Sequence, residues 1–363
     1  AGVNTWQQLL QHWQHDQQLA KLPVCFLPLH RVNSVALACS EDSSTLVQCD
    51  YPELNELVAQ GRFSQLLVIA GRGKASYNNG ILQLPDNADM ALLRHEFMHI
   101  FGFIDEYALA PATAAEVCRP GKIHPNLLLA TDVDAYMQYW KLAEVPTLTA
   151  VDSCSAAGIQ AYRVIADDNV MRFYELPLPD HYFQLIQLIL RQPEQLMPVQ
   201  YYYAYLARQR QDWEKWQQFM QQASEWGYAD AQQALVAPAK DDDAGWKKYL
   251  QTVAVQNMGT VTNSPFLYYL APESDPEFAA KFERQTESAT QAVARGVQPG
   301  NMLAFGSSAS GKMADMIQAV FKDVSPDSMK GVRVVFIGQS ADNARVQAAI
   351  QPTGAEYIFV EAK

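Results

Sequence analysis

Hydrophobic positions in the first part of the chain change between the period of a strand and the period of a helix. Apolar runs such as SQLLVIAG (64–71) and GILQLP (80–85) predict strands, as do VCFLPLHRV, SVALAC and TLVQC between residues 24 and 49. The stretch DNADMALLRHEFMHIF (86–101) predicts a helix that begins with capping residues, and Gly102 follows where a C-cap glycine is expected. Strands and helices without a regular βαβ repeat predict an α+β fold.

The later part of the chain predicts helices first and a layered α/β unit afterwards. Residues 179–192 and 198–237 have helical patterns, and ASEWGYADAQQAL (223–235) resembles the second helix of a Sel1-type repeat. A single repeat of this kind cannot form a solenoid, so we expect a helical hairpin that packs on a neighbouring domain. After about residue 295, the order strand, helix, strand, helix, strand predicts a small α/β unit.

Length and charge divide the chain further and exclude some partners. The charged stretch PAKDDDAG (238–245) is a candidate linker within the 363 residues. We therefore predict a first domain at 1–197, a helical segment with linker at 198–242 and an α/β accessory domain at 243–363. The formal charge of −12 argues against nucleic acid as a binding partner. No apolar run reaches the length of a membrane span. A protein partner is expected for the helical and C-terminal domains.

Cysteine spacing and the start of the sequence favour export. Five cysteines lie in the first 154 residues, and none forms a CxxC pair. Their spacing predicts a hairpin closed by Cys39 and Cys49. Cys118 and Cys154 are expected to close a longer loop, which leaves Cys25 over; reduced buried thiols are the alternative. The sequence begins AGVNTW, as cleavage by signal peptidase or a trimmed chain would leave it, so we expect a periplasmic or secreted protein.

The stretch RHEFMHIFGFIDEY (94–107) carries the strongest chemical pattern. His95 and His99 lie one turn apart on the predicted helix, so both imidazoles leave the same face and could hold one metal ion. Glu96 points about 100° away, where it can reach a water on that metal without being a ligand. This division of roles suits zinc hydrolysis, in which Glu96 takes the proton of a zinc-bound water. The alternative is a surface helix with two histidines in register, because a bare HExxH also occurs by chance.

The residues that follow resemble a known family. Gly102 permits a sharp turn that brings Asp105 within reach as a third ligand. The pattern HExxHxxGxxD resembles the metzincin metallopeptidases, in the version with an aspartate as third ligand. HEFMHIFGFIDEY is similar to the motif of the IgA-peptidase-type family of bacterial secreted metzincins, over about fourteen residues. The resemblance implies a Zn²⁺-dependent endopeptidase with His95, His99 and Asp105 as ligands. Glu96 is then its general base.

Four further residues enter through the same resemblance. It implies a methionine turn below the metal, for which Met171 is the candidate, and a plain core methionine is the alternative. Tyr174 could donate to an oxyanion, with a packed aromatic as the alternative. Glu106 is the rival third ligand, and Tyr107 belongs to the family motif without a role that chemistry assigns. The strand at 80–85 could offer its edge to a peptide.

A second motif is a near miss, and it defines the rival functions. GSSASGKM (306–313) nearly fits the phosphate-binding pattern GxxxxGK[ST], but Met313 stands where a magnesium-binding hydroxyl is required. A Ser/Gly turn that caps a helix is favoured over a nucleotide-binding protein built around Lys312. The main interpretation is a zinc endopeptidase acting on proteins or peptides. The alternative is a weak or inactive metallopeptidase fold that serves as an envelope binding or scaffold module. The intact Glu96 argues against this alternative.

Overall fold

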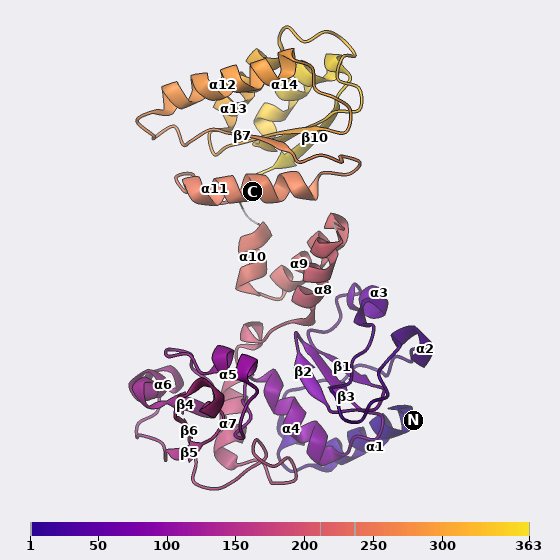
Figure 1. The fold of residues 1–363 in the computed structure, drawn as a ribbon, viewed down its shortest axis with the longest axis vertical. Helices are drawn as coiled ribbons and strands as arrows, with labels where there is room; N and C mark the ends of the chain where they lie inside the picture. Colours follow the sequence, from indigo (N-terminus) through magenta and orange to yellow (C-terminus); the bar gives the residue numbers. More distant parts are fainter. Residues whose placement is uncertain (1, 211, 236, 363) are drawn as a thin grey trace. The chain divides into compact units, whose positions relative to one another are not determined.

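The computed structural model describes residues 2–210, 212–235 and 237–362 (Figure 1). The chain forms two compact units: the first holds residues 1–204 and 226–228, and the second holds 205–225 and 229–363. The described residues form helices and three small sheets, which confirms the α+β class. No helix among them is long and apolar enough to cross a membrane.

A mixed sheet forms the centre of the first unit. Its strands are β1 (Leu66–Ile69), β2 (Ser76–Asn78) and β3 (Ile81–Leu84). β3 pairs in parallel with β1 and antiparallel with β2, so the strand order is β1-β3-β2. The strand predicted at 80–85 therefore exists, but both of its sides are paired, and the expectation that it offers an edge to a peptide is wrong. The strand beside it, β2, lies at the edge of the sheet.

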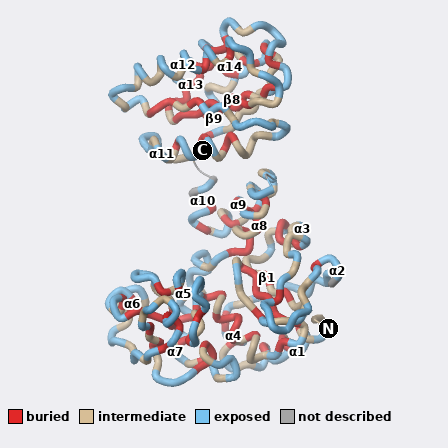
Figure 2. Tube along the Cα trace, viewed as in Figure 1, coloured by how far each residue is buried: buried red, intermediate tan, exposed pale blue. Residues whose placement is uncertain are grey.

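Helix α4 (Met90–Ile100) packs against this sheet and carries the histidines. The Asp89 side chain caps it by accepting a hydrogen bond from the backbone N–H of Leu92 (2.8 Å). Gly102 follows with φ of +80°, a left-handed conformation that favours glycine. α1 (Gly2–His15) buries Trp13 edge to face against Phe97 of α4, with ring centroids 4.8 Å apart. Capping and an apolar face thus fix α4 in the core, as its sequence predicts (Figure 2).

The segment between α1 and β1 differs from its sequence pattern. Residues 23–33 form neither helix nor strand, and α2 (Ser34–Leu37) is a short helix followed later by α3 (Asn55–Val58). Within TLVQC, Leu46 makes only an isolated bridge to Lys74. Pro28 lacks the N–H that a sheet ladder needs, and Phe26 instead packs its ring against two tryptophans of α1. Burial against α1 therefore replaces strand pairing here.

The stretch after α4 contains several prolines and nevertheless forms regular helices and strands. It contains α5 (Pro111–Val117), α6 (Val133–Trp140) and an antiparallel sheet of β4 (Leu127–Leu129), β5 (Thr149–Val151) and β6 (Ala161–Arg163) in the order β4-β6-β5. α7 (Asp180–Ile189) closes the unit and confirms the helix predicted at 179–192.

Both predicted disulfides are present in the first unit. Cys39 is bonded to Cys49, and Cys118 is bonded to Cys154. Cys25 is free and exposed. Two disulfides are consistent with an oxidising, exported environment.

The second unit contains a parallel sheet that is covered on both faces. Its strands are β7 (Phe266–Tyr269), β8 (Met302–Gly306), β9 (Arg333–Gly338) and β10 (Glu356–Glu361), in the order β10-β9-β8-β7. Alternate residues of β8 pack on α11 (Asp243–Gln256) on one face. The others pack on the opposite face, against α13 (Ser310–Phe321), in a core that α12 (Phe278–Ala294) and α14 (Ser340–Ile350) complete. Burial on both faces explains the continuous apolar runs of β8 and β9.

The phosphate-binding near miss forms a hydrogen-bonded turn at the start of α13. The Ser310 hydroxyl donates to Asp342 (2.6 Å), and the backbone N–H of Ala309 donates to the Ser307 hydroxyl. Lys312 is half-exposed and lies 3.8 Å from Asp315 on the same helix. These contacts favour the turn that the sequence suggested over an anion site.

Three helices follow α7 along the chain. They are α8 (Val199–Gln209), α9 (Trp213–Glu225) and α10 (Ala229–Leu235); α9 and α10 pack on each other, and α10 lies in the Sel1-like stretch of residues 223–235. The start of α8 belongs to the first unit: Val199 donates its backbone N–H to Ser64 (2.8 Å), and the buried Tyr203 hydroxyl donates to the Tyr51 carbonyl (2.6 Å).

We expect a fragment of residues 1–240 to fold without the α/β unit, and to melt well above a fragment of residues 1–197. The shorter fragment lacks Val199 and Tyr203, both fully buried, and the loss of one such side chain typically costs about 2–5 kcal/mol. That loss corresponds to a melting temperature lower by about 5–15 °C for a unit of this size. Thermal melts followed by circular dichroism would compare the two. Equal melting temperatures, or an unfolded 1–240 fragment, would contradict the expected boundary.

Candidate metal centre

Two histidines of α4 direct one ring nitrogen each toward a common point. The Nδ1 atom of His95 lies 2.7 Å from the carbonyl oxygen of Val170, and that of His99 lies 2.8 Å from the carbonyl of Phe103. A carbonyl only accepts hydrogen bonds, so both Nδ1 atoms carry the proton. In the neutral form of each ring the lone pair is therefore on Nε2, which is the state in which imidazole binds a metal.

Asp105 lies against the Nε2 atoms of both histidines. Its Oδ1 atom is 3.2 Å from Nε2 of His95 and 3.5 Å from Nε2 of His99. That buried oxygen nevertheless has no aligned hydrogen-bond donor among the described residues. Ligands bonded to zinc at 2.0–2.1 Å in a tetrahedron are separated by about 3.4 Å. The three atoms therefore have the spacing of ligands around one ion, although they do not point at one another as hydrogen-bonded partners would.

Glu96 completes the group from the next position on the helix. The side chain is buried, and its Oε2 atom has no hydrogen-bond partner among the described residues. A carboxylate oxygen of Glu96 and one nitrogen of each histidine lie within 4.8 Å of one another, so these three residues could hold a metal ion. Burial raises the pKa of Glu96, whereas the two imidazoles lower it. An unsatisfied carboxylate oxygen is costly in a buried place unless a water or an ion meets it.

The two carboxylates differ in how they meet the histidines. An oxygen of Glu96 lies within 4.8 Å of a ring nitrogen of each histidine. Asp105 comes closer, with its Oδ1 atom 3.2 Å from Nε2 of His95 and 3.5 Å from Nε2 of His99. We regard Asp105 as the stronger ligand candidate, because one oxygen contacts both nitrogens. Glu96 lies beside them, with one carboxylate oxygen within the longer distance of a ring nitrogen of each histidine.

Charges in the site favour a cation. Burial lowers the pKa of His99, but Asp105 and Glu96 outweigh it and raise this pKa to about 9. Burial raises the pKa of Asp105, yet the two imidazoles hold it well below its usual range. In the absence of metal, the site therefore keeps a proton on His99 at neutral pH, which a bound metal ion would displace.

Glu106 is turned away from the histidine nitrogens into a buried hydrogen-bond network. Its Oε1 atom accepts from the Asn126 amide (3.0 Å) and from the Tyr182 hydroxyl (2.6 Å). Its Oε2 atom accepts from the Asn169 amide (2.7 Å). Burial raises the pKa of Glu106, and the hydrogen bonds from these three donors lower it. These partners cannot be recognised in the sequence, because they lack any motif or regular spacing.

Met171 lies in the turn that holds His95. It is fully buried in the core and directly follows Val170, whose carbonyl accepts from His95. The Met171 carbonyl also accepts from the backbone N–H of Glu106 (2.9 Å). The turn is therefore bonded both to the metal-site helix and to the loop that carries Asp105.

The two tyrosines of the sequence analysis have different surroundings. Burial and the negative charges of Asp105 and Glu96 raise the pKa of Tyr107, so its phenol lies beside the site although 45% of the residue is exposed. Tyr174 is 42% exposed, and a hydrogen bond with Glu175 raises its pKa. It thus lies at the surface and is not the packed aromatic that was the alternative.

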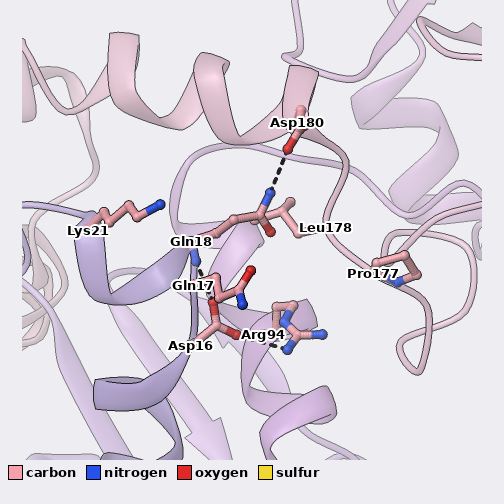
Figure 3. A pocket seen from close by; sticks show the side chains of 8 residues that line it. All are labelled: Asp16, Gln17, Gln18, Lys21, Arg94, Pro177, Leu178 and Asp180. Carbon is pink, nitrogen blue, oxygen red and sulfur yellow. Dashed lines mark hydrogen bonds and ion pairs between the residues drawn. The ribbon is translucent and has the colours of Figure 1, made fainter.

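A separate polar cavity is lined by Arg94 of α4 together with residues 16–18, 21, 177, 178 and 180 (Figure 3). Its charged side chains are mostly paired: Arg94 lies 3.0 Å from Asp16, and Gln18 donates to Asp180 (3.1 Å). None of the residues of the metal group lines it. This cavity is therefore separate from the metal centre.

Comparison with known proteins adds no relative. No protein-family model matches the chain, and no curated protein is similar to it. The assignment of the site therefore rests on its own geometry, in which His95, Glu96 and His99 form a buried group that could hold a metal ion.

Proposed function

We propose that the protein is an exported zinc-dependent endopeptidase of the metzincin type. The observation that carries the proposal is the arrangement of three candidate ligand atoms, the Nε2 atoms of His95 and His99 and Oδ1 of Asp105, with the unsatisfied Glu96 carboxylate beside them. Two imidazoles and one carboxylate are a ligand set that zinc uses when one position stays open for catalysis. The two disulfides support an exported location.

Zinc in this site would lower the pKa of a bound water and polarise the peptide carbonyl. The chain supplies the remaining chemistry. Glu96 accepts the proton of the attacking water and later delivers it to the leaving amine. Its burial raises its pKa, which favours a carboxylate that exchanges protons during turnover. The Nδ1–H bonds to Val170 and Phe103 keep both histidines in the tautomer that binds metal.

We further propose that the substrate backbone binds along β2. This strand forms the outer edge of the sheet against which α4 packs. An edge strand can add an extended peptide through main-chain hydrogen bonds, independently of the peptide's sequence. A scaffold protein that binds zinc and peptide without turnover is the rival function, and it shares this surface. The second unit, which includes α9 and α10, remains a proposed site for a protein partner.

We expect the purified protein to contain about one zinc ion per chain and to cleave an unfolded protein such as reduced casein. A chelator should abolish cleavage, and added Zn²⁺ should restore it, because the three ligands are preformed. Metal content would be measured by mass spectrometry and cleavage by release of amines. Protein that contains no zinc after purification in zinc-supplemented buffer would contradict the proposal. Bound zinc without any cleavage would favour the scaffold.

A further inference from the structure

The carbonyl groups that orient the two histidines belong to separate segments of the chain. His99 donates to Phe103, in the loop that leads to Asp105, and His95 donates to Val170, in the turn before α7. Each carbonyl must stay in place if its imidazole is to keep the metal-binding orientation. Two asparagines hold these segments.

Each segment is hydrogen-bonded through its backbone to a different asparagine side chain. Asn126 accepts from the N–H of Ile104 (2.9 Å) and donates to the carbonyl of the same residue (2.7 Å), directly after Phe103. Asn169 accepts from the N–H of Met171 (2.9 Å), so it spans the carbonyl of Val170. Both asparagines are fully buried, and breaking a hydrogen bond in such a place lowers stability more than it does at the surface.

Glu106 joins the two asparagines to each other. One oxygen accepts from Asn126 and the other from Asn169, while its own backbone N–H donates to the Met171 carbonyl (2.9 Å). Tyr182 adds a third donor to the carboxylate, and Arg163 lies 3.9 Å from it. Among the described residues, the four side chains that contact the carboxylate all supply donors, so the arrangement requires two acceptor oxygens at this place.

We infer that Glu106 is a positioning residue of the metal centre, which links through Asn126 and Asn169 the carbonyl groups that orient both histidines. This inference rests on the proposed function only in so far as the site binds a metal ion. Glu106, the second carboxylate of the Asp105-Glu106-Tyr107 sequence, would then position the site without contacting metal or substrate. Because the link is made of side-chain hydrogen bonds, an isosteric amide should loosen the site without emptying the core.

The test compares metal binding in Glu106→Gln and in two matched tyrosine variants. In Glu106→Gln, one N–H would face an asparagine donor, so a hydrogen bond is lost and the loop shifts. We expect Co²⁺ and Zn²⁺ to bind about 10–100-fold more weakly, as is typical for loss of an outer hydrogen-bond partner of metal ligands. The visible absorption bands of bound Co²⁺, which report ligand geometry, should also change.

The tyrosine variants separate this role from general stability. Tyr182→Phe and Tyr203→Phe each remove one buried hydroxyl that donates at 2.6 Å, but only Tyr182 contacts Glu106. We expect Tyr182→Phe to weaken Co²⁺ binding roughly threefold to tenfold and Tyr203→Phe to leave it unchanged. Melting temperatures would be measured for all variants. Tyr182→Phe also keeps the inference testable if Glu106→Gln fails to fold.

Four outcomes are distinct. Weaker Co²⁺ binding with altered bands in Glu106→Gln and Tyr182→Phe alone supports the inference, even if the wild type cleaves no peptide and the proposed function fails. Wild-type affinity and bands in both variants overturn the inference and leave the peptidase proposal intact. An equal loss of affinity in Tyr203→Phe also overturns it, because the effect is then one of stability. A wild type that binds neither ion overturns both.

Discussion

Replacement of Glu96 by glutamine is expected to abolish peptide hydrolysis while zinc stays bound. The amide has nearly the shape of the carboxylate but cannot accept the proton of the attacking water. Loss of a general base typically lowers the rate by about 10²–10⁴-fold, and zinc is retained because His95, His99 and Asp105 still supply the ligands. Zinc content and cleavage of a broad peptide library would be measured side by side for both proteins.

Glu116→Gln is the matched control for this experiment. Glu116 lies in the same unit, but it is exposed and pairs only loosely with Lys122, at 3.7 Å. Its replacement should change the rate by less than about twofold, since surface ion pairs contribute little. Equal rates in the wild type and Glu96→Gln would mean that the activity has another source, and the proposed base would have to be abandoned.

Replacement of Asp105 by alanine is expected to weaken zinc binding by more than about 100-fold, beyond the 10–100-fold expected for an outer-shell change such as Glu106→Gln. Asp105 contributes the oxygen that lies against both histidine nitrogens, whereas both oxygens of Glu106 are already bonded to buried donors. Titration against a zinc-binding dye would rank the variants. The reverse order, with Glu106→Gln weaker than Asp105→Ala, would make Glu106 the third ligand.

The same titration has an expected pH dependence. With its pKa raised to about 9, His99 is protonated in the metal-free site at neutral pH, and zinc must displace that proton. Wild-type affinity should therefore rise about tenfold per pH unit up to pH 9 and level off above it. Asp105→Ala removes the main group that raises this pKa, so its plateau should begin at lower pH. A wild-type affinity that does not change between pH 6.5 and 8.5 would contradict the protonated state.

Local patterns determined the elements that carry the chemistry. The capping aspartate, the apolar face and Gly102 define α4 within a window of about seventeen residues, and the i, i+4 spacing puts His95 and His99 on one face. Continuous apolar runs likewise determined β8 and β9 of the second unit. The cysteine spacings were enough to predict both disulfides. These features depend on periodicity and short separations, which a single sequence displays directly.

Tertiary structure decided the features that depend on partners far away in the chain. Asp105 and Glu106 are adjacent carboxylates with the same local pattern, yet only one meets the histidines. The choice is made by donors 20, 63 and 76 residues away, namely Asn126, Asn169 and Tyr182, which bind the second carboxylate. A buried carboxylate is stable only where donors satisfy it, and no local window contains those donors.

Strand pairing was decided in the same way. The alternation in residues 80–85 predicts a strand, but it does not say which neighbours take its two sides, and β1 and β2 take both. Residues 24–32 were predicted to form a strand and instead pack Phe26 against α1. By itself the sequence determined the helix, the common face of its two histidines and the candidate base. The approach of Asp105 to the histidines, the free sheet edge and the network around Glu106 arise from contacts through space, because hydrogen-bond partners and burial are properties of the folded chain.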